Sequence, residues 1–334
     1  MSRVVRRFRP GWLVAAGLAA AIVAAPSGGA TRPVTAGVVV IETSLGIERA
    51  SAAGTGMVLT SSGRVLTNNH VIRGATTIRV VDPGTRRTYP ARVLGYSVSA
   101  DVALLQLGGG AGLPTVTPGN SSKTRVGQLV TAVGNTGGAG RLKASAGQIT
   151  DLAQTISARD DSGDVERLTG LIETDAALQP GDSGGPLLDG GRTVLGMDTA
   201  ASRSFVFQDG GGVGYAIPIN RALLIARQIA AGRGSATVHI GATAFLGVQV
   251  QPSASSGTAG ALVADVVPSS PAERAGLVAG DVIVSVNGRT LPTSTALRLA
   301  LLQRKPGDRI RLGWLDQFGG RHAATVKLAS GPPQ

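Results

Sequence analysis

A serine framed by glycines is the most chemically suggestive stretch of the sequence. Residues 181–186 read Gly-Asp-Ser-Gly-Gly-Pro, with Ser183 at the third position. A serine hydroxyl is a weak nucleophile until a base removes its proton and donors stabilise the resulting oxyanion. Glycines permit a tight turn in which neighbouring N–H groups converge on one point. We therefore expect Ser183 to be a nucleophile, with the amides of Gly181 and Ser183 as oxyanion donors. A plain glycine-rich surface turn is the alternative.

The same residues also fit G-x-S-x-G, the nucleophile turn of α/β-hydrolases. That fold requires a helix directly after the serine, and then an acid and a histidine. Here residues 186–197 predict short strands and a turn, and the only later histidines are His239 and His322. The pattern therefore favours catalytic partners that precede the serine.

Two residues upstream of Ser183 could serve as its partners. The runs 51–60 and 64–72 predict a β-hairpin, and His70, the only histidine before the serine, lies where the second strand ends. Asp101 directly precedes the apolar run 102–107, so its carboxylate should lie beside a core and needs a polar partner. An imidazole N–H would be one. The plain alternatives are a structural or solvated histidine and a turn aspartate.

The remaining pattern predicts several domains built mainly of strands. The 334 residues are 43% hydrophobic and include 49 glycines, which favour turns over long helices. Short strands recur from residue 37 to residue 218, a spacing typical of sandwiches or barrels. Asn220 is the expected cap of a helix that runs to about Ala231. Residues 232–241 form a candidate linker, and a small α+β domain follows.

The N-terminus and the composition limit the location and the partners. Residues 1–30 combine four arginines, an apolar run and small residues, which predicts a signal peptide or an N-terminal anchor and a secreted or cell-envelope protein. The net charge of +12 could favour peripheral contact with anionic envelope surfaces, although no basic run with interleaved aromatics suggests nucleic-acid binding. With no cysteine and three scattered histidines, we expect no disulfide, metal or other cofactor.

The three residues occur in the order histidine, aspartate, serine. This order and the sequence segments around the three residues resemble the HtrA/Deg family of trypsin-like serine proteases. The resemblance covers residues 36–330. The segments that carry it are 67–72 (Thr-Asn-Asn-His-Val-Ile), 100–105 (Ala-Asp-Val-Ala-Leu-Leu), 133–135 (Val-Gly-Asn), 174–186 and 214–218 (Gly-Tyr-Ala-Ile-Pro).

This resemblance implies a mostly β, chymotrypsin-like double β-barrel over residues 31–231, and, after the linker, an α+β PDZ domain over residues 242–330. His70 and Asp101 would come from the first barrel and Ser183 from the second. His70 would be the general base and then the general acid, while Asp101 would orient its imidazole. The expected activity is that of an exported, cofactor-free serine endopeptidase that acts through an acyl-enzyme.

The resemblance also implies substrate sites. Leu178 and Ala201 would flank the pocket for the residue before the scissile bond, and neither is charged, so small or medium apolar residues should be preferred. Such residues are buried in folded proteins, which points to misfolded or unstructured substrates. The amides of Leu246, Gly247 and Val248 would bind the carboxylate of C-terminal peptides. A plain β-turn is the alternative there.

The chain also departs from the family pattern. Asp182 replaces the asparagine of many relatives, and residues 135–138 read Asn-Thr-Gly-Gly where the family usually has Asn-Pro-Phe-Gly. Family trimers use N-terminal aromatic residues, yet none occurs between Thr31 and Thr88, so a homotrimer remains open. The alternative function is a non-cleaving or latent chaperone or PDZ adaptor that uses the protease fold for binding.

Overall fold

The computed structural model describes residues 33–47, 50–160, 165–199, 205–207, 213–252 and 259–334. The predicted export segment 1–30 lies outside these residues. None of the helices in the described part of the chain has the length and apolar character needed to cross a bilayer.

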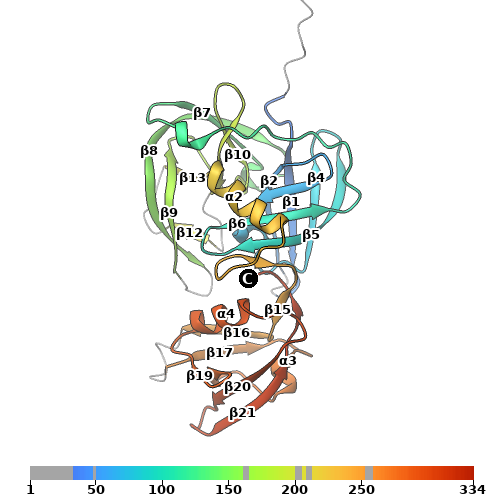
Figure 1. Cartoon of the computed structure of the whole chain (residues 1–334), viewed down its shortest axis with the longest axis vertical. Helices are drawn as coiled ribbons and strands as arrows, with labels where there is room; N and C mark the ends of the chain where they lie inside the picture. The colour runs from blue at the N-terminus through green and yellow to red at the C-terminus, as the bar shows by residue number, and fades with distance from the viewer. Residues whose placement is uncertain (1–32, 48–49, 161–164, 200–204, 208–212, 253–258) are drawn as a thin grey trace, which may run out of the picture. The chain divides into compact units, whose positions relative to one another are not determined.

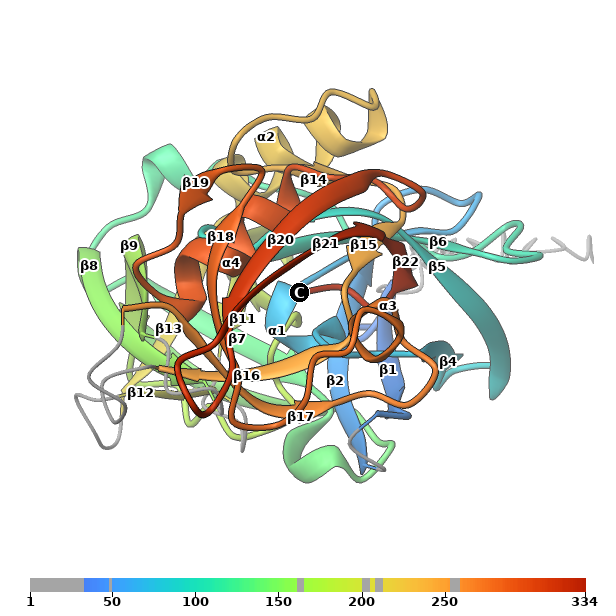
Figure 2. The same cartoon turned by 90° about the horizontal axis from the view of Figure 1, so that it is seen from below.

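Residues 38–107 form a closed antiparallel barrel. The strand order is β5-β4-β1-β2-β3-β6, and β6 pairs again with β5 to complete the ring. Figures 1 and 2 show β1 beside β2 and β4. The strands are β1 (Val38–Leu45), β2 (Ala50–Val58), β3 (Arg64–Thr67), β4 (Thr77–Asp82), β5 (Arg87–Ser97) and β6 (Val102–Leu107).

The unbroken apolar run in β6 follows from burial on both of its faces. Successive side chains of a strand point to opposite sides. Ala103 and Leu105 pack in the core of the first barrel, while Val102 and Leu104 join a second core shared with the other barrel. Asp101 therefore stands at the start of a strand with no solvent-facing side.

A second closed barrel follows, with the order β8-β7-β10-β11-β13-β9 and a closing pair between β8 and β9. β12 (Phe205–Phe207) pairs with the last residues of β8, Ala158 to Asp160. The barrel strands are β7 (Leu129–Gly134), β8 (Lys143–Asp160), β9 (Val165–Thr174), β10 (Pro186–Leu188), β11 (Val194–Thr199) and β13 (Gly214–Pro218).

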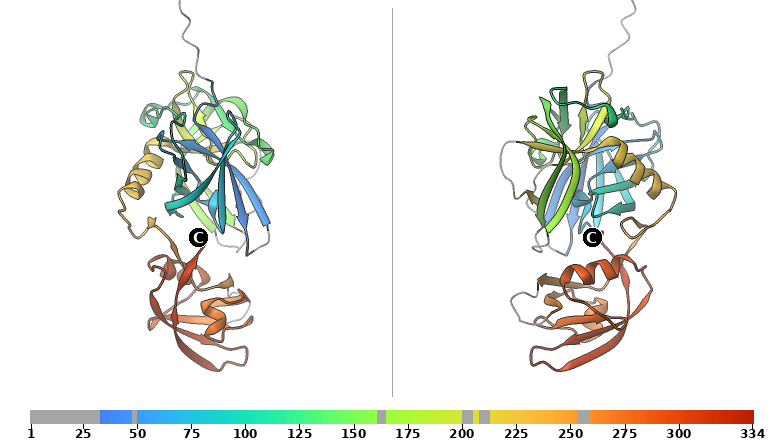
Figure 3. Two further views of the ribbon diagram at one scale, coloured as in Figure 1. Left: turned by 90° about the vertical axis from the view of Figure 1, so that its right-hand side faces the viewer. Right: turned by 60° about the vertical axis from the view of Figure 1, so that its left-hand side comes forward.

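Helix α2 (Ile219–Ala230) packs against both barrels (Figure 3). Its buried side chains, among them Ala222 and Ala226, are spaced by one helical turn and join the shared core. The helix begins one residue before Asn220, so the predicted asparagine cap is wrong. Asn220 lies inside the first turn, and its amide donates to Asn120 and Ser122. The candidate linker contains a short strand, β14 (His239–Ile240), which pairs with β5.

The last part of the chain forms a smaller α+β unit. Its main sheet has the order β16-β17-β18-β20-β21, with β19 on β18, and β15 pairs separately with β22 (Figure 2). The elements are β15 (Thr243–Phe245), β16 (Val248–Pro252), β17 (Ala261–Val266), α3 (Pro271–Arg274), β18 (Val282–Val286), β19 (Arg289–Thr290), α4 (Ser294–Leu302), β20 (Arg309–Leu315), β21 (Arg321–Lys327) and β22 (Ala329–Gly331).

Candidate active site

His70 lies in a short helix rather than at a strand end. β3 stops at Thr67, and α1 (Asn69–Ile72) begins two residues later with all four of its residues buried. His70 is 8% exposed. Because β3 pairs with both β2 and β6, the chain enters α1 directly beside the start of β6, where Asp101 lies.

Asp101 holds His70 through both carboxylate oxygens. Its Oδ1 accepts the backbone N–H of His70 at 2.9 Å, and its Oδ2 accepts Nδ1–H of the imidazole at 2.8 Å. Asp101 is fully buried with a left-handed φ of 52°, and its carbonyl accepts the Asn68 side chain at 3.0 Å. With Nδ1 used as a donor, the neutral ring keeps Nε2 as its proton acceptor.

Ser183 stands on a turn just before β10. The turn is held by bonds from the N–H of Asp182 to the carbonyl of Gln179 and from the N–H of Gly185 to the carbonyl of Asp182. A Cβ added at Gly184, where φ is +85°, would lie 2.1 Å from the Thr55 carbonyl oxygen. Only glycine fits this position.

The Ser183 turn is bonded to the strands that lead to His70. The N–H of Thr55 in β2 donates to the Ser183 carbonyl at 2.9 Å, and the Thr67 hydroxyl donates to the Thr55 carbonyl at 2.8 Å. On the other side, Gly184 donates to the carbonyl of Asp198 in β11. These bonds connect the Ser183 turn to β2 and, through Thr67, to the strand that leads into α1, where His70 bonds to Asp101.

The expected oxyanion donor Gly181 belongs to a peptide with a fixed orientation. The Pro180 carbonyl accepts the N–H of Gly137 at 2.8 Å. In a trans peptide the C=O and the following N–H point in opposite directions, so the Gly181 N–H faces away from Gly137. The turn that supplies this contact is η2 (Thr136–Gly138), the segment that departs from the usual family sequence.

Two buried carboxyl groups belong to the Ser183 turn and to the strand bonded to it, those of Asp182 and Asp198. Burial raises the pKa of Asp182, against the effect of hydrogen bonds from the Gln179 N–H and the Thr136 hydroxyl and of the Lys143 charge. Burial raises the pKa of Asp198 well above its usual range, and the charge of Asp182 adds to this rise. Neither carboxyl oxygen of Asp198 bonds to any residue that the structure describes. The upward shift of the pKa is therefore larger for Asp198 than for Asp182.

Of the two predicted pocket residues, the structure describes only Leu178. Leu178 is half-buried and packs against Gly214 at the start of β13. Ala201 lies outside the described residues. Within those residues, no cluster of three His, Cys, Asp or Glu side chains could hold a metal ion.

The predicted carboxylate loop is held from one side by α3 and the turn before it. The Leu246 carbonyl accepts the N–H of Ala272, and the Gly247 carbonyl accepts the N–H of Val267. Because both carbonyls point this way, the following N–H groups, those of Gly247 and Val248, point to the other side.

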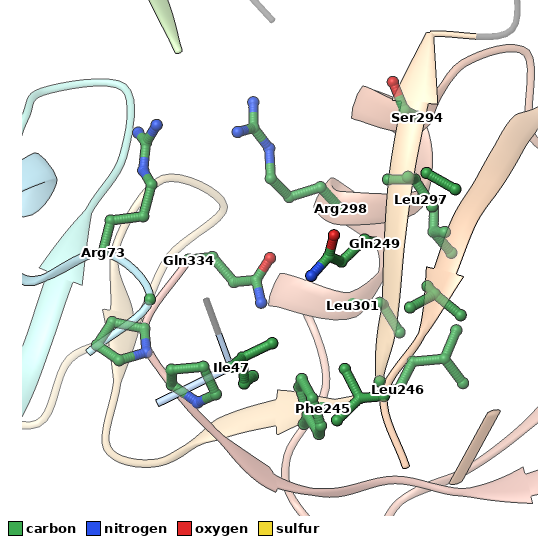
Figure 4. Close-up of a pocket in the computed structure, with 18 of the residues that line it drawn as sticks. Ile47, Arg73, Phe245, Leu246, Gln249, Ser294, Leu297, Arg298, Leu301 and Gln334 are labelled. Atoms are coloured by element: carbon green, nitrogen blue, oxygen red, sulfur yellow. The ribbon is translucent and has the colours of Figure 1, made fainter. Parts of the chain in front are cut away.

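These N–H groups border a pocket between β16 and α4. Apolar lining comes from Phe245, Leu246, Leu297 and Leu301, and Gln334 also lines the pocket (Figure 4). The pocket could hold a peptide end with an apolar last residue.

Several residues of the site carry no signal that a sequence pattern could reveal. Thr55 and Thr199 are hydroxyl residues of strands, and Asn135 directly follows the apolar strand β7. Their importance depends on contacts with residues far away in the sequence. Only the segment 133–135, through its family resemblance, could have indicated one of them.

Two family models match the chain. A trypsin-like peptidase domain matches residues 54–197, and a PDZ domain matches residues 244–315. The closed barrels and the α+β unit described above correspond to these two domains. The predicted fold class, a chymotrypsin-like double barrel followed by a PDZ domain, is thereby confirmed.

Two named serine proteases are similar to most of the chain. Serine protease PepD of Mycobacterium tuberculosis is 34% identical over 308 residues, which cover 87% of this chain and 63% of PepD. The periplasmic pH-dependent serine endoprotease DegQ of Escherichia coli is 33% identical over 273 residues, which cover 78% of this chain and 56% of DegQ. The chain thus spans less than two thirds of the length of these relatives.

Among solved structures, the HtrA-type protease AlgW with tripeptide is 28% identical with a TM-score of 0.50, and the match covers 89% of this chain and 95% of that one. Fold and site thus define a trypsin-like peptidase domain joined to a PDZ domain. The chain belongs to the HtrA family.

Proposed function

We propose that this chain is a serine endopeptidase in which His70, Asp101 and Ser183 form the catalytic triad. The observation that carries the proposal is the buried 2.8 Å bond between His70 and Asp101, next to strands whose backbone binds the Ser183 turn. Relatives that are named serine proteases support the same activity.

In this proposal His70 Nε2 takes the proton of the Ser183 hydroxyl while the serine oxygen attacks the scissile carbonyl carbon. The resulting imidazolium keeps its Nδ1–H on Asp101, whose negative charge stabilises it. The N–H groups of Gly181 and Ser183 bind the oxyanion. His70 then gives its proton to the leaving amine, the peptide bond breaks, and an acyl-enzyme remains. A water molecule repeats the steps with His70 as base and releases the acid.

We further propose that the substrates are misfolded or unstructured proteins cleaved after small or medium apolar residues. Leu178 and Ala201 would form uncharged walls of the pocket. The PDZ domain would bind C-terminal peptides through the N–H groups of the 246–248 loop, with the apolar last residue against Leu297 and Leu301. The N–H groups of Gly247 and Val248, which point away from α3, support this role.

We propose a location outside the cytoplasm, in the cell envelope or secreted. Relatives named as periplasmic endoproteases support it, as does the sequence pattern of residues 1–30. Removal of residues 1–30 during export would yield a shorter N-terminus, which mass spectrometry of the secreted protein can detect.

Cleavage of casein by the purified protein tests the activity. Casein is unstructured, so it should be degraded by the wild type and by Ser62→Ala, a control at an exposed serine. Ser183→Ala should abolish degradation. Undiminished cleavage by Ser183→Ala would refute the nucleophile, whereas an intact wild type that binds casein but never cleaves it would favour the chaperone or adaptor alternative.

A further inference from the structure

We propose that the hydroxyl of Thr55 is the positioning group that holds the Gly181 amide in the orientation of an oxyanion donor. The inference rests on the proposed function and adds a residue to it. Thr55 lies in β2 of the first barrel, whereas Gly181 precedes the nucleophile in the second. The site thus depends on a side chain 126 residues away from the group it controls.

The Thr55 hydroxyl makes two short bonds inside the protein. It donates to the Gly181 carbonyl at 2.7 Å and accepts the N–H of Asn135 at 2.8 Å. Since a hydroxyl has one proton and the Asn135 N–H can only donate, the direction of both bonds is fixed. Thr55 is fully buried, so water cannot replace either bond without entering the core.

These two bonds act on Gly181 from both sides. Gly181 has a φ of +99°, in a region that glycine enters freely, so sterics alone do not fix its peptides. The Thr55 hydroxyl holds the carbonyl that follows the Gly181 Cα. Through Asn135 it also anchors the η2 turn, whose Gly137 N–H holds the Pro180 carbonyl that precedes the Gly181 N–H. Without the hydroxyl, the Gly181 N–H could rotate away from the substrate.

Close packing around Gly181 supports this dependence. A Cβ at Gly181 would lie 2.2 Å from the Asn135 carbonyl oxygen and 2.8 Å from the Gly138 nitrogen. The oxyanion turn and the 135–138 turn are therefore in backbone contact. The Thr55 hydroxyl bonds to both turns at the backbone, while the Thr136 hydroxyl reaches the oxyanion turn through the Asp182 side chain. Other groups hold different parts of the turn: the backbone N–H of Thr55 holds the Ser183 carbonyl, and Asp182 binds the Gln179 N–H.

The test replaces the hydroxyl while keeping the shape. Thr55→Val should lower kcat by about 10- to 100-fold, since loss of one oxyanion donor costs about 10²–10³. KM should change less than about threefold because a donor aimed at the oxyanion acts mainly in the transition state. Inhibition by a peptide boronic acid, which forms a tetrahedral adduct, should weaken by a factor similar to that of kcat/KM. Thr55→Ser, which keeps the hydroxyl, should restore kcat.

Thr43→Val is the matched control. Thr43 is a buried threonine of the same barrel whose hydroxyl donates to a backbone carbonyl, that of Ala52, away from the Ser183 turn. Its kcat should stay near that of the wild type at equal melting temperature. If Thr55→Val does not fold, Thr55→Cys replaces it, since a thiol is a weak donor, and an intermediate loss of kcat is expected.

The proposal is overturned if the Val or Cys variant keeps wild-type kcat and boronate affinity, or if Thr55→Ser loses as much activity as Thr55→Val. Failure of the proposed function itself is seen separately. In that case the wild type would not cleave, or Ser183→Ala would cleave as well as the wild type.

Discussion

The Thr199 hydroxyl donates to Oδ2 of Asp101 at 3.3 Å and so links the second barrel to the acid of the first. Thr199 ends β11, and the preceding residue, Asp198, accepts the N–H of Gly184 through its carbonyl. One strand end therefore binds both the partner of His70 and the turn that carries Ser183. Together with Thr55, this strand end is one of the places where the two barrels are bonded at the site.

Thr199→Val should reduce activity without unfolding the protein. The Asp101 carboxylate would lose one donor, and a hydrogen bond to a charged group contributes about 1.5–3 kcal/mol. We expect kcat to fall about tenfold, the equivalent of about 1.4 kcal/mol, because the imidazole is then oriented less firmly. Steady-state kinetics on a peptide substrate, with Thr199→Ser as the variant that keeps the hydroxyl, measures this. Equal kcat for Thr199→Val and wild type would contradict it.

Gly184→Ala should destabilise the protease domain severely. The new Cβ would meet the Thr55 carbonyl oxygen at 2.1 Å and the Thr67 hydroxyl at 2.3 Å, at a φ of +85°. Backbone strain of about 1–3 kcal/mol and overpacking of similar size predict a loss of roughly 2–6 kcal/mol in the free energy of unfolding. Urea unfolding measures it.

Gly190→Ala is the control for this substitution, because a Cβ there has no neighbour within 4 Å. Its unfolding midpoint should match that of the wild type. If Gly184→Ala also unfolds at the wild-type urea midpoint, this result contradicts the close contacts described around Gly184.

The buried carboxyl of Asp198 predicts a loss of stability as pH rises. An unfolded Asp has a pKa of about 3.9, whereas burial and the Asp182 charge raise the pKa of Asp198 well above its usual range in the folded state. Between the two pKa values the folded protein holds a proton that the unfolded chain has released. Its stability therefore falls as pH rises through this window and stays lower above the folded pKa.

Asp198→Asn should remove this decrease of folding stability with rising pH, because asparagine does not ionise. The free energy of unfolding of the variant, relative to wild type, should increase from pH 4 towards pH 8, by about 1.4 kcal/mol for each unit of pKa difference. Asp316→Asn provides the opposite case, because the His322 hydrogen bond lowers the pKa of Asp316, so the small contribution of this group to stability is lost as pH falls. A pH-independent difference between wild type and Asp198→Asn would show that Asp198 is ionised in the folded protein.

The PDZ loop predicts recognition of a free peptide carboxylate. A peptide with an apolar last residue should bind the protein at least tenfold more tightly than the same peptide with an amidated end, as measured by calorimetry. Gly247→Ala should abolish this preference, since its Cβ would lie 2.1 Å from Cβ of Ser270 at a φ of +89°. Equal affinity for the free and amidated peptides would exclude the loop as a carboxylate site.

The sequence predicted the parts of the site that depend on local pattern. The apolar run 102–107 is strand β6, and the expected imidazole partner of Asp101 is present as His70 Nδ1. Residues 270–273 read Ser-Pro-Ala-Glu, a local pattern typical of a helix start, and Ser270 caps α3 with Pro271 as the first helical residue.

The sequence could not predict features that depend on contacts across the fold. His70 was expected at a strand end, but the chain turns into α1 two residues after β3. The roles of Thr55 and Thr199 arise only when two barrels are brought together, since their bonds span 126 and 98 residues. The raised pKa of Asp198 likewise follows from its burial, which no neighbouring residue in the sequence indicates.

Labelling with a fluorophosphonate probe tests the proposed nucleophile most directly, because the probe reacts covalently with an activated serine and needs no knowledge of the substrate. We expect one adduct per chain by intact mass, mapped to the peptide that contains Ser183. Labelling should be lost in Ser183→Ala and strongly slowed in His70→Ala, while Ser62→Ala labels at the wild-type rate. Labelling at another residue, or unchanged labelling of folded Ser183→Ala, would contradict the account.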